Sequence, residues 1–168
     1  VLNGGFEKWV KEGRPIEQEA TRYAPMRSRS EPGVSNPMAS KEDVLSALAD
    51  ESALVVDSLS KESFAGTATV GYGKRKGHID GAVNLPMDAL LDEDGCFLPE
   101  PALRQVLQTA GLLDASRVIT YCGGGIAATV DAFALKLLGY DNVSVYDASL
   151  FEWANDPALP MVSGGDLG

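Results

Sequence analysis

The 168-residue sequence has few of the residues that metal sites, disulfide scaffolds and nucleic-acid interfaces require. One histidine, His78, excludes most histidine-based metal sites, and two cysteines are too few for a disulfide-rich fold. No apolar run is long enough to cross a bilayer, and no segment has the pattern of a signal peptide. With 24 acids and 14 bases, the net charge is −10, which argues against nucleic-acid binding. We therefore expect a cytoplasmic protein without metal, cofactor, nucleic-acid partner or membrane contact.

Charge and proline content divide the chain into parts. Residues 1–40 carry six bases and five acids, whereas residues 41–168 carry eight bases and 19 acids. Prolines, arginines and serines give residues 14–39 the composition of an extended connector. Ser40 then has the pattern of a helix N-cap, with Asp43 three positions later to complete a capping box. The compact domain is predicted to begin there.

From Ser40 onward, apolar strand patterns alternate with amphipathic helix patterns. Strands are predicted at residues 53–56, 82–85, 118–121 and 143–146, and helices at 44–48, 101–110 and 130–138. This alternation predicts an α/β domain with a parallel sheet covered by helices on both faces. The domain is predicted over residues 40–163, followed by a tail over 164–168.

A nine-residue segment near the C-terminus echoes the start of the chain. Residues 1–9 align with 145–153: two apolar residues, an amide or carboxylate, two small residues and, at the end, tryptophan. Chance similarity is one interpretation, because the segment is short. The other is that residues 1–13 are the tail of a second copy of the domain. Such a tail would be poorly anchored, or would pack on the domain through Phe6 and Trp9.

The most informative local feature is Cys122, which lies between a predicted buried strand and a glycine turn that leads into a helix. Ligands of open α/β sheets bind beyond the carboxyl ends of strands, where Cys122 is expected. Backbone N–H groups of such a turn can converge on an anion at the positive end of the helix dipole. This environment lowers a cysteine pKa from about 8.5 to roughly 3.5–7.5 and produces a nucleophilic thiolate. The alternative is a small buried hydrophobe at a strand end.

Two other chemistries fit parts of this loop. Residues 123–128 match the dinucleotide pattern G-x-G-x-x-A, and Asp147 follows at the end of the next predicted strand. However, only about 40 residues remain after the pattern, which is too few for the rest of a dinucleotide fold. A cysteine phosphatase or arsenate reductase needs an arginine six positions after the cysteine, where Ala128 stands. The phosphatase interpretation therefore fails on its key residue.

Three motifs together resemble those of one known family: GHIDGAVNLP at 77–86, CGGGIA at 122–127 and VYDASLFEW at 145–153. The family is the rhodanese sulfurtransferases, specifically the catalytic C-terminal half of the tandem-domain thiosulfate and 3-mercaptopyruvate enzymes. Residues 1–15 are similar to the end of the family's inactive N-terminal domain. The resemblance implies a rhodanese-like open parallel sheet of five strands, with helices on both faces and the missing N-terminal rhodanese domain as an intramolecular partner.

The resemblance also implies a sulfurtransferase that works through a persulfide on Cys122. The thiolate would take sulfur from thiosulfate, the preferred donor, or from 3-mercaptopyruvate, and pass it to cyanide or a thiol. The persulfide would be held by backbone N–H groups of the loop, those of Gly123, Gly124, Gly125, Ile126 and Ala127. The alternative function is a non-enzymatic persulfide carrier or a regulatory rhodanese module.

A cation is expected near the cysteine, because both donors are anions. Arg75 is our candidate, since a guanidinium can hold a sulfonate or carboxylate through two hydrogen bonds; a solvated loop is the alternative. Leu59 and Ser63 stand where the family carries two arginines, and the glycines after Cys122 replace basic residues, so the donor does not follow from the loop. His78 is expected to be a structural hydrogen-bonder.

Overall fold

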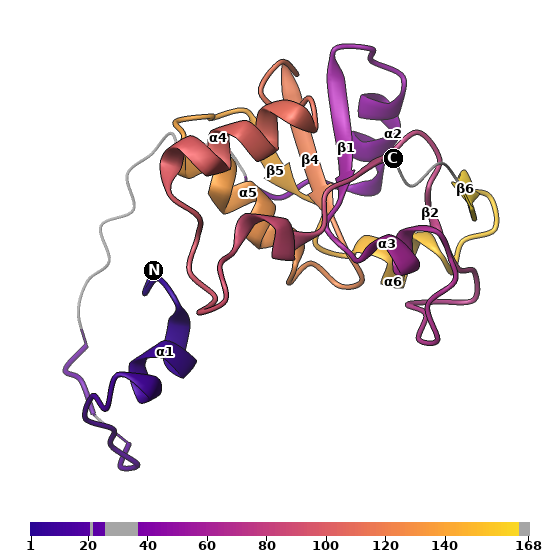
Figure 1. Cartoon of the computed structure of the whole chain (residues 1–168). Helices are drawn as coiled ribbons and strands as arrows, with labels where there is room; N and C mark the ends of the chain where they lie inside the picture. The colour runs from indigo at the N-terminus through magenta and orange to yellow at the C-terminus, as the bar shows by residue number, and fades with distance from the viewer. Residues whose placement is uncertain (21, 26–36, 165–168) are drawn as a thin grey trace.

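The core of the computed structural model, which describes residues 1–20, 22–25 and 37–164, is a parallel sheet (Figure 1). Four strands lie in the order β3-β1-β4-β5. Their bounds are β1 (Ala53–Asp57), β3 (Val83–Asn84), β4 (Arg117–Tyr121) and β5 (Val143–Val145). The two central strands are apolar runs with buried side chains on both faces, as expected for parallel strands covered by helices.

Helices cover both faces of this sheet, which confirms the predicted α/β class. One face carries α2 (Lys41–Leu48) and α6 (Ser149–Trp153); the other carries α4 (Glu100–Thr109), α5 (Ala128–Leu137) and the short η1 (Met87–Leu90). Successive strand residues point to opposite faces, so Val55 and Ile119 join the first core and Val56 and Val118 the second. The predicted capping box is also confirmed: Asp43 N–H donates to Ser40 Oγ, and Ser40 N–H donates to the Asp43 carboxylate.

The expected fifth strand is reduced to one bridged residue in the part of the chain that the structure describes. Met38 forms an isolated parallel bridge with Val145. Ala39 N–H donates to Val145 O at 2.8 Å, and Val145 N–H donates to Pro37 O at 2.7 Å. The chain therefore joins the sheet edge inside the stretch predicted as a connector, 14–39. Of that stretch, residue 21 and residues 26–36 lie outside the described residues.

A second, smaller sheet was not predicted from the sequence. It pairs β2 (His78–Ile79) with β6 (Met161–Val162) in antiparallel fashion. The pairing fixes the end of a long loop, residues 65–77, which follows the short α3 (Lys61–Phe64). Gly77 is required there, because its φ is +112° and a Cβ would lie 2.0 Å from a backbone oxygen of β6. Of the predicted tail, only Gly164 is described, and its N–H donates to Ala65 O.

The N-terminal segment lies apart from the sheet and forms α1 (Gly5–Lys11) (Figure 1). It contacts the loop over residues 92–97 through three polar side chains, those of Asn3, Lys8 and Lys11. No residue of α1 is buried, and Phe6 is 65% exposed. The expected packing through Phe6 is therefore wrong: polar contacts hold this segment.

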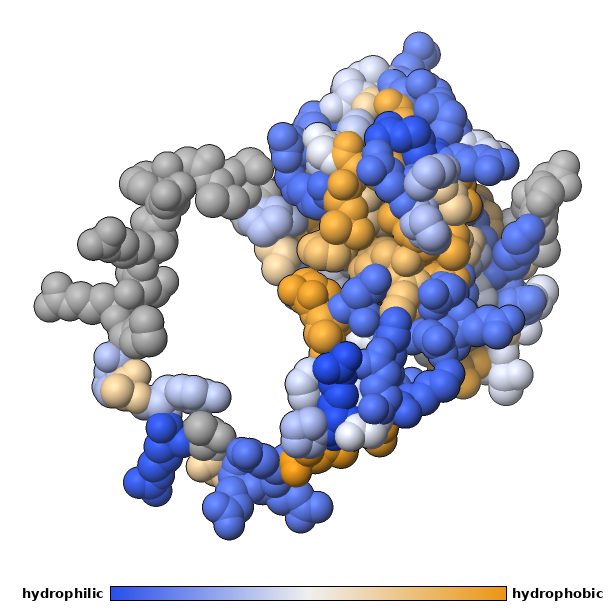
Figure 2. Space-filling model, turned by 60° about the vertical axis from the view of Figure 1, so that its left-hand side comes forward, coloured by the Kyte–Doolittle hydropathy of each residue, from blue (hydrophilic) through white to orange (hydrophobic). Residues whose placement is uncertain are grey.

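The surface is mostly hydrophilic, with one area where apolar residues gather on the face shown in Figure 2. At the sheet edge beyond β5, a shallow depression has a mostly apolar lining that includes Pro37, Ala132, Phe133, Val143 and Val145. Among the described residues, no helix is long and apolar enough to span a membrane.

Candidate active site

Cys122 lies directly after β4, at the carboxyl edge of the sheet, as predicted. Its side chain is 2% exposed, and Thr120 Oγ1 donates to Ala128 O at 2.9 Å, which ties the strand to the first residue of α5. The intervening residues 122–127 are called the Cys122 loop below. Four of its N–H groups, those of Gly123, Gly124, Ile126 and Ala127, have no acceptor within the described ranges. They are available to an anion at the N-terminus of α5.

Two backbone hydrogen bonds from α6 orient these N–H groups. Leu150 N–H donates to Cys122 O at 3.1 Å, and Phe151 N–H donates to Gly123 O at 2.9 Å. In a trans peptide the carbonyl and the following N–H point in opposite directions. The N–H groups of Gly123 and Gly124 therefore point away from α6, and α6 holds the loop from the side of its carbonyl groups.

Ser149, which was not among the predicted site residues, holds the start and the middle of the loop. Its fully buried Oγ accepts hydrogen bonds from Cys122 N–H at 3.0 Å and Gly125 N–H at 3.2 Å, and donates to Tyr146 O at 2.7 Å. Ser149 has a φ of +50°, the one positive φ at a non-glycine residue in the described ranges. Such a conformation costs of order 1–3 kcal/mol, which these hydrogen bonds offset.

Neighbouring side chains lie close against all three loop glycines. A Cβ on Gly123 would lie 2.2 Å from the Tyr72 ring, and one on Gly124 would lie 2.5 Å from the Phe151 ring. A Cβ on Gly125, whose φ is +80°, would lie 2.4 Å from the Asp147 carboxylate. We expected the glycines to admit a ligand to the backbone. The structure shows that they also admit two aromatic rings and a carboxylate.

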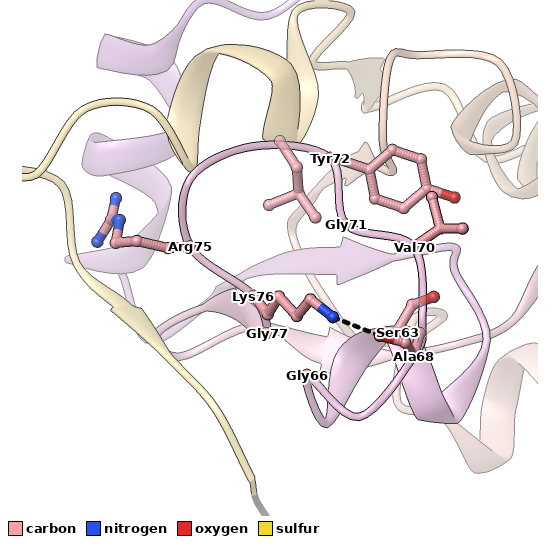
Figure 3. A pocket seen from close by; sticks show the side chains of 10 residues that line it. Ser63, Gly66, Ala68, Val70, Gly71, Tyr72, Arg75, Lys76 and Gly77 are labelled. Carbon is pink, nitrogen blue, oxygen red and sulfur yellow. Dashed lines mark hydrogen bonds between the residues drawn. The ribbon is translucent and has the colours of Figure 1, made fainter.

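Arg75 has a structural role, which corrects its assignment as the anion-binding residue. Its guanidinium makes four hydrogen bonds, at 2.6–3.4 Å, to backbone carbonyls at and beyond the end of α6: those of Trp153, Ala154, Asp156 and Leu159. Figure 3 shows this side chain pointing away from Tyr72. Lys76 is also engaged, because its Nζ donates to Ala68 O at 2.8 Å. Ser63 lines the small pocket beside these residues (Figure 3).

A pair of buried acids lies beside the Cys122 loop, at the end of β1 and in the first turns of α5. Neither Asp57 nor Asp131 is exposed to solvent. Burial raises the pKa of Asp57 to about 6 and that of Asp131 to about 8. Ser58 Oγ donates to one oxygen of Asp131 at 2.7 Å, and Leu59 N–H donates to one oxygen of Asp57 at 2.9 Å. Burial thus favours the protonated form of Asp131 more strongly than that of Asp57.

The single histidine, His78, and the second cysteine, Cys96, have partners outside the Cys122 loop. His78 Nδ1 forms a hydrogen bond with Phe64 O at 2.7 Å and stacks on the Phe64 ring, which is the structural role that the sequence suggested. Cys96 is buried in the 92–97 loop, where its Sγ accepts a hydrogen bond from Lys8 Nζ at 3.0 Å. In the portion of the chain that is described, no three His, Cys, Asp or Glu side chains gather as metal ligands.

Comparisons with known proteins agree with this geometry. The model of the rhodanese-like domain matches residues 40–156. The chain is 34% identical to thiosulfate sulfurtransferase of Bos taurus, over 100% of this chain and 57% of that protein. It is 32% identical to the sulfur carrier protein TtuD of Thermus thermophilus, over 98% of this chain and 61% of that protein. The chain thus spans about three-fifths of the length of these relatives.

Solved structures show the same likeness. The anaerobic ergothioneine biosynthesis enzyme from Chlorobium limicola, in complex with trimethyl histidine, superposes with a TM-score of 0.84. The match has 25% sequence identity and covers 99% of this chain and 41% of that one.

Proposed function

The chain belongs to the family of rhodanese-like domains, and from that premise we propose that it transfers sulfur through a persulfide on Cys122. One observation carries the proposal: Cys122 lies at a strand end and begins a loop in which four N–H groups have no acceptor among the described residues. Those N–H groups and the N-terminus of α5 can hold the anionic sulfur that transfer through a cysteine persulfide requires.

The first half-reaction loads the cysteine. The Cys122 thiolate attacks the outer sulfur of thiosulfate, the S–S bond of the donor breaks, and sulfite leaves with the electron pair. With 3-mercaptopyruvate as the alternative donor, a C–S bond breaks instead, and the pyruvate enolate takes up a proton. Negative charge then resides on the outer sulfur of the persulfide, where the N–H groups of Gly123 and Gly124 stabilise it.

The second half-reaction unloads the cysteine. Cyanide or a thiolate attacks the outer sulfur, the S–S bond to Cys122 breaks, and the cysteine leaves as a thiolate, ready for another donor.

A persulfide carrier is the second candidate, because one relative is named a sulfur carrier protein. A carrier would load Cys122 and pass the sulfur to a single partner, with slow steady-state turnover on cyanide or small thiols. An enzyme would turn over repeatedly on the same acceptors.

The test is the intact mass of the reduced protein after exposure to thiosulfate or to 3-mercaptopyruvate in separate reactions. We expect the wild type to gain one sulfur atom that cyanide removes. Cys96→Ser is the matched control and should gain it equally, whereas Cys122→Ser should not. A gain on Cys122→Ser, or no gain on the wild type with either donor, would overturn the proposal.

A further inference from the structure

Side chains from three other segments lie against the Cys122 loop. Tyr72 comes from the 65–77 loop and lies against Gly123; Phe151 comes from α6 and lies against Gly124. Asp147, in the turn between β5 and α6, lies against Gly125. The Tyr72 and Phe151 rings meet edge to face, with centroids 5.8 Å apart. These three residues, with Ile126 of the loop itself, are called the rim below.

The rim faces solvent, although most of it is apolar. Phe151 is 61% exposed and Ile126 is 84% exposed, and Asp147 is exposed as well. A single exposed apolar side chain is ordinary, but here two of them flank the loop that carries the nucleophile. The rim is therefore available to whatever molecule approaches Cys122.

The charge of the rim is negative. The structure places the Asp147 carboxylate against the loop, while the Arg75 and Lys76 side chains are engaged by backbone carbonyls. Gly123 and Gly124 contribute no side chain. Over residues 41–168 as a whole, 19 acids outnumber eight bases, of which Lys74, Arg75 and Lys76 lie in the 65–77 loop.

From this arrangement we propose that the rim selects the sulfur acceptor, and that the acceptor is a small thiol bearing an ammonium group. The inference rests on the proposed function of Cys122. Aromatic faces attract a cation through the ring quadrupole, by about 0.5–1 kcal/mol at exposed sites, and a carboxylate attracts it directly. The same carboxylate repels an acceptor that carries a carboxylate of its own.

The loop and the rim then recognise different parts of the acceptor. Its thiolate attacks the outer sulfur of the Cys122 persulfide, a new S–S bond forms, and the bond to Cys122 breaks with the electron pair remaining on the cysteine. One thiolate and one persulfide enter, and one persulfide and one thiolate leave, so charge and oxidation state balance. The ammonium group meanwhile lies among Tyr72, Phe151 and Asp147.

The experiment compares 2-aminoethanethiol with mercaptoacetate as acceptors from loaded protein. Cys122 is loaded with thiosulfate, or with inorganic polysulfide if thiosulfate is ineffective, and loss of the sulfur is followed by mass. The quantity measured is the ratio of the two second-order rate constants. The different intrinsic nucleophilicities of the two thiols cancel when that ratio is compared between protein variants.

We expect Asp147→Asn and Phe151→Leu each to lower the ratio about fivefold, which corresponds to about 1 kcal/mol. Asp141→Asn is the matched control, because it removes the same charge before β5 instead of after it, and its ratio should stay within about twofold. An unchanged ratio in both rim variants, with sulfur loading intact, would overturn this inference alone. Failure of both donors to load Cys122 would overturn the proposed function and the inference with it.

Discussion

Residues 1–9 and 145–153 share a sequence pattern, and the structure gives them a similar backbone at the helix start but not at the residue before it, where Gly4 has a φ of +89° and Ala148 a φ of −62°. Gly5 and Ser149 occupy equivalent positions, and both have a left-handed φ, +61° and +50°. A helix begins at each of them, α1 and α6.

The tryptophans that end the two segments also behave alike. The indole N–H of Trp9 donates to Pro15 O at 2.9 Å, and that of Trp153 donates to Pro160 O at 2.8 Å. Their burial differs: Trp153 has no exposed surface and meets the Tyr146 ring, whereas Trp9 is half-buried beneath the Arg14 guanidinium. The helix start and the indole hydrogen bond thus follow the nine-residue pattern, and burial follows the domain around it. The likeness supports our proposal that residues 1–13 end a preceding copy of the domain.

The largest expected effect separates the two tryptophans. Trp153→Ala removes a fully buried side chain and should lower the free energy of unfolding by about 3–5 kcal/mol. Trp9→Ala should change it by less than about 0.5 kcal/mol. Urea denaturation measures both, and Trp153→Phe is a milder variant should the alanine protein fail to fold. Equal losses at the two positions would contradict the comparison.

The next effect separates Ser149 from Gly5. Ser149→Gly relaxes the left-handed backbone but leaves the N–H groups of Cys122 and Gly125 without their acceptor. Sulfur loading of Cys122 should slow about tenfold, at nearly unchanged stability. Ser149→Ala should slow loading equally and also destabilise the fold, because it keeps the strained φ.

The control for Ser149 is Gly5→Ser, which places serine at the equivalent position of the N-terminal segment and should leave loading unchanged. Ser149 is a positioning residue in this account. Normal loading by Ser149→Gly would therefore remove it from the mechanism.

Features of the fold could be predicted from the sequence where their pattern lies within a few neighbouring residues, and not where they depend on residues far apart in the chain. The β1 and β4 strands are continuous apolar runs, and the cap at Ser40 needs only Asp43, so both were predictable. The Cys122 loop was predictable for the same reason, because strand, glycines and helix follow one another. The paired strands β2 and β6 have two residues each and lie about 80 residues apart, so neither carries a periodic pattern.

The roles of two site residues depend on distant contacts. From the sequence, Arg75 belongs to a basic cluster that is expected to be solvated, because the carbonyls that accept its hydrogen bonds lie 78 to 84 residues later in the chain. Ser149 could have been recognised by alignment with Gly5, since a glycine at the equivalent position indicates a left-handed backbone. Asp131 gave no such signal, because a single acid in an amphipathic helix is usually solvated.

The buried acids of the domain and the exposed acid that binds α1 should change stability with pH in opposite directions. Burial raises the pKa of Asp131 to about 8 and that of Asp57 to about 6, whereas both carboxyls have ordinary values of about 4 in the unfolded chain. At pH values between the unfolded and the folded pKa of each acid, the folded state therefore binds more protons than the unfolded state. The domain should therefore lose stability as pH rises from about 4 to about 8. The Lys11 ammonium instead lowers the pKa of Asp94, so the attachment of α1 should weaken as pH falls.

Urea midpoints at about pH 5 and about pH 8.5 measure the first response, and Asp131→Asn should remove most of the decrease. Asp94→Asn is the matched control and should retain it. A wild-type midpoint that rises over this range would contradict a protonated Asp131.

The smallest expected effect concerns the polar attachment of α1. Lys11→Gln removes an exposed ion pair to Asp94, so global unfolding should not change. Backbone N–H groups of α1 should exchange with solvent about two to three times faster, because the segment opens more often. Lys41→Gln, which removes the exposed Lys41–Glu152 pair inside the domain, should leave exchange in α1 unaltered.

The bridge at Met38 has a mechanical consequence. Val145, the last residue of β5, is held between hydrogen bonds to Pro37 and Ala39, and four residues later the chain reaches Ser149 at the start of α6. Tension on the chain before Pro37 would load these two bonds in shear and pull on the segment that anchors the Cys122 loop. Two bonds yield before a four-stranded sheet does, so this edge works as a weak mechanical link. Such tension would therefore detach this edge first and leave the four-stranded sheet folded.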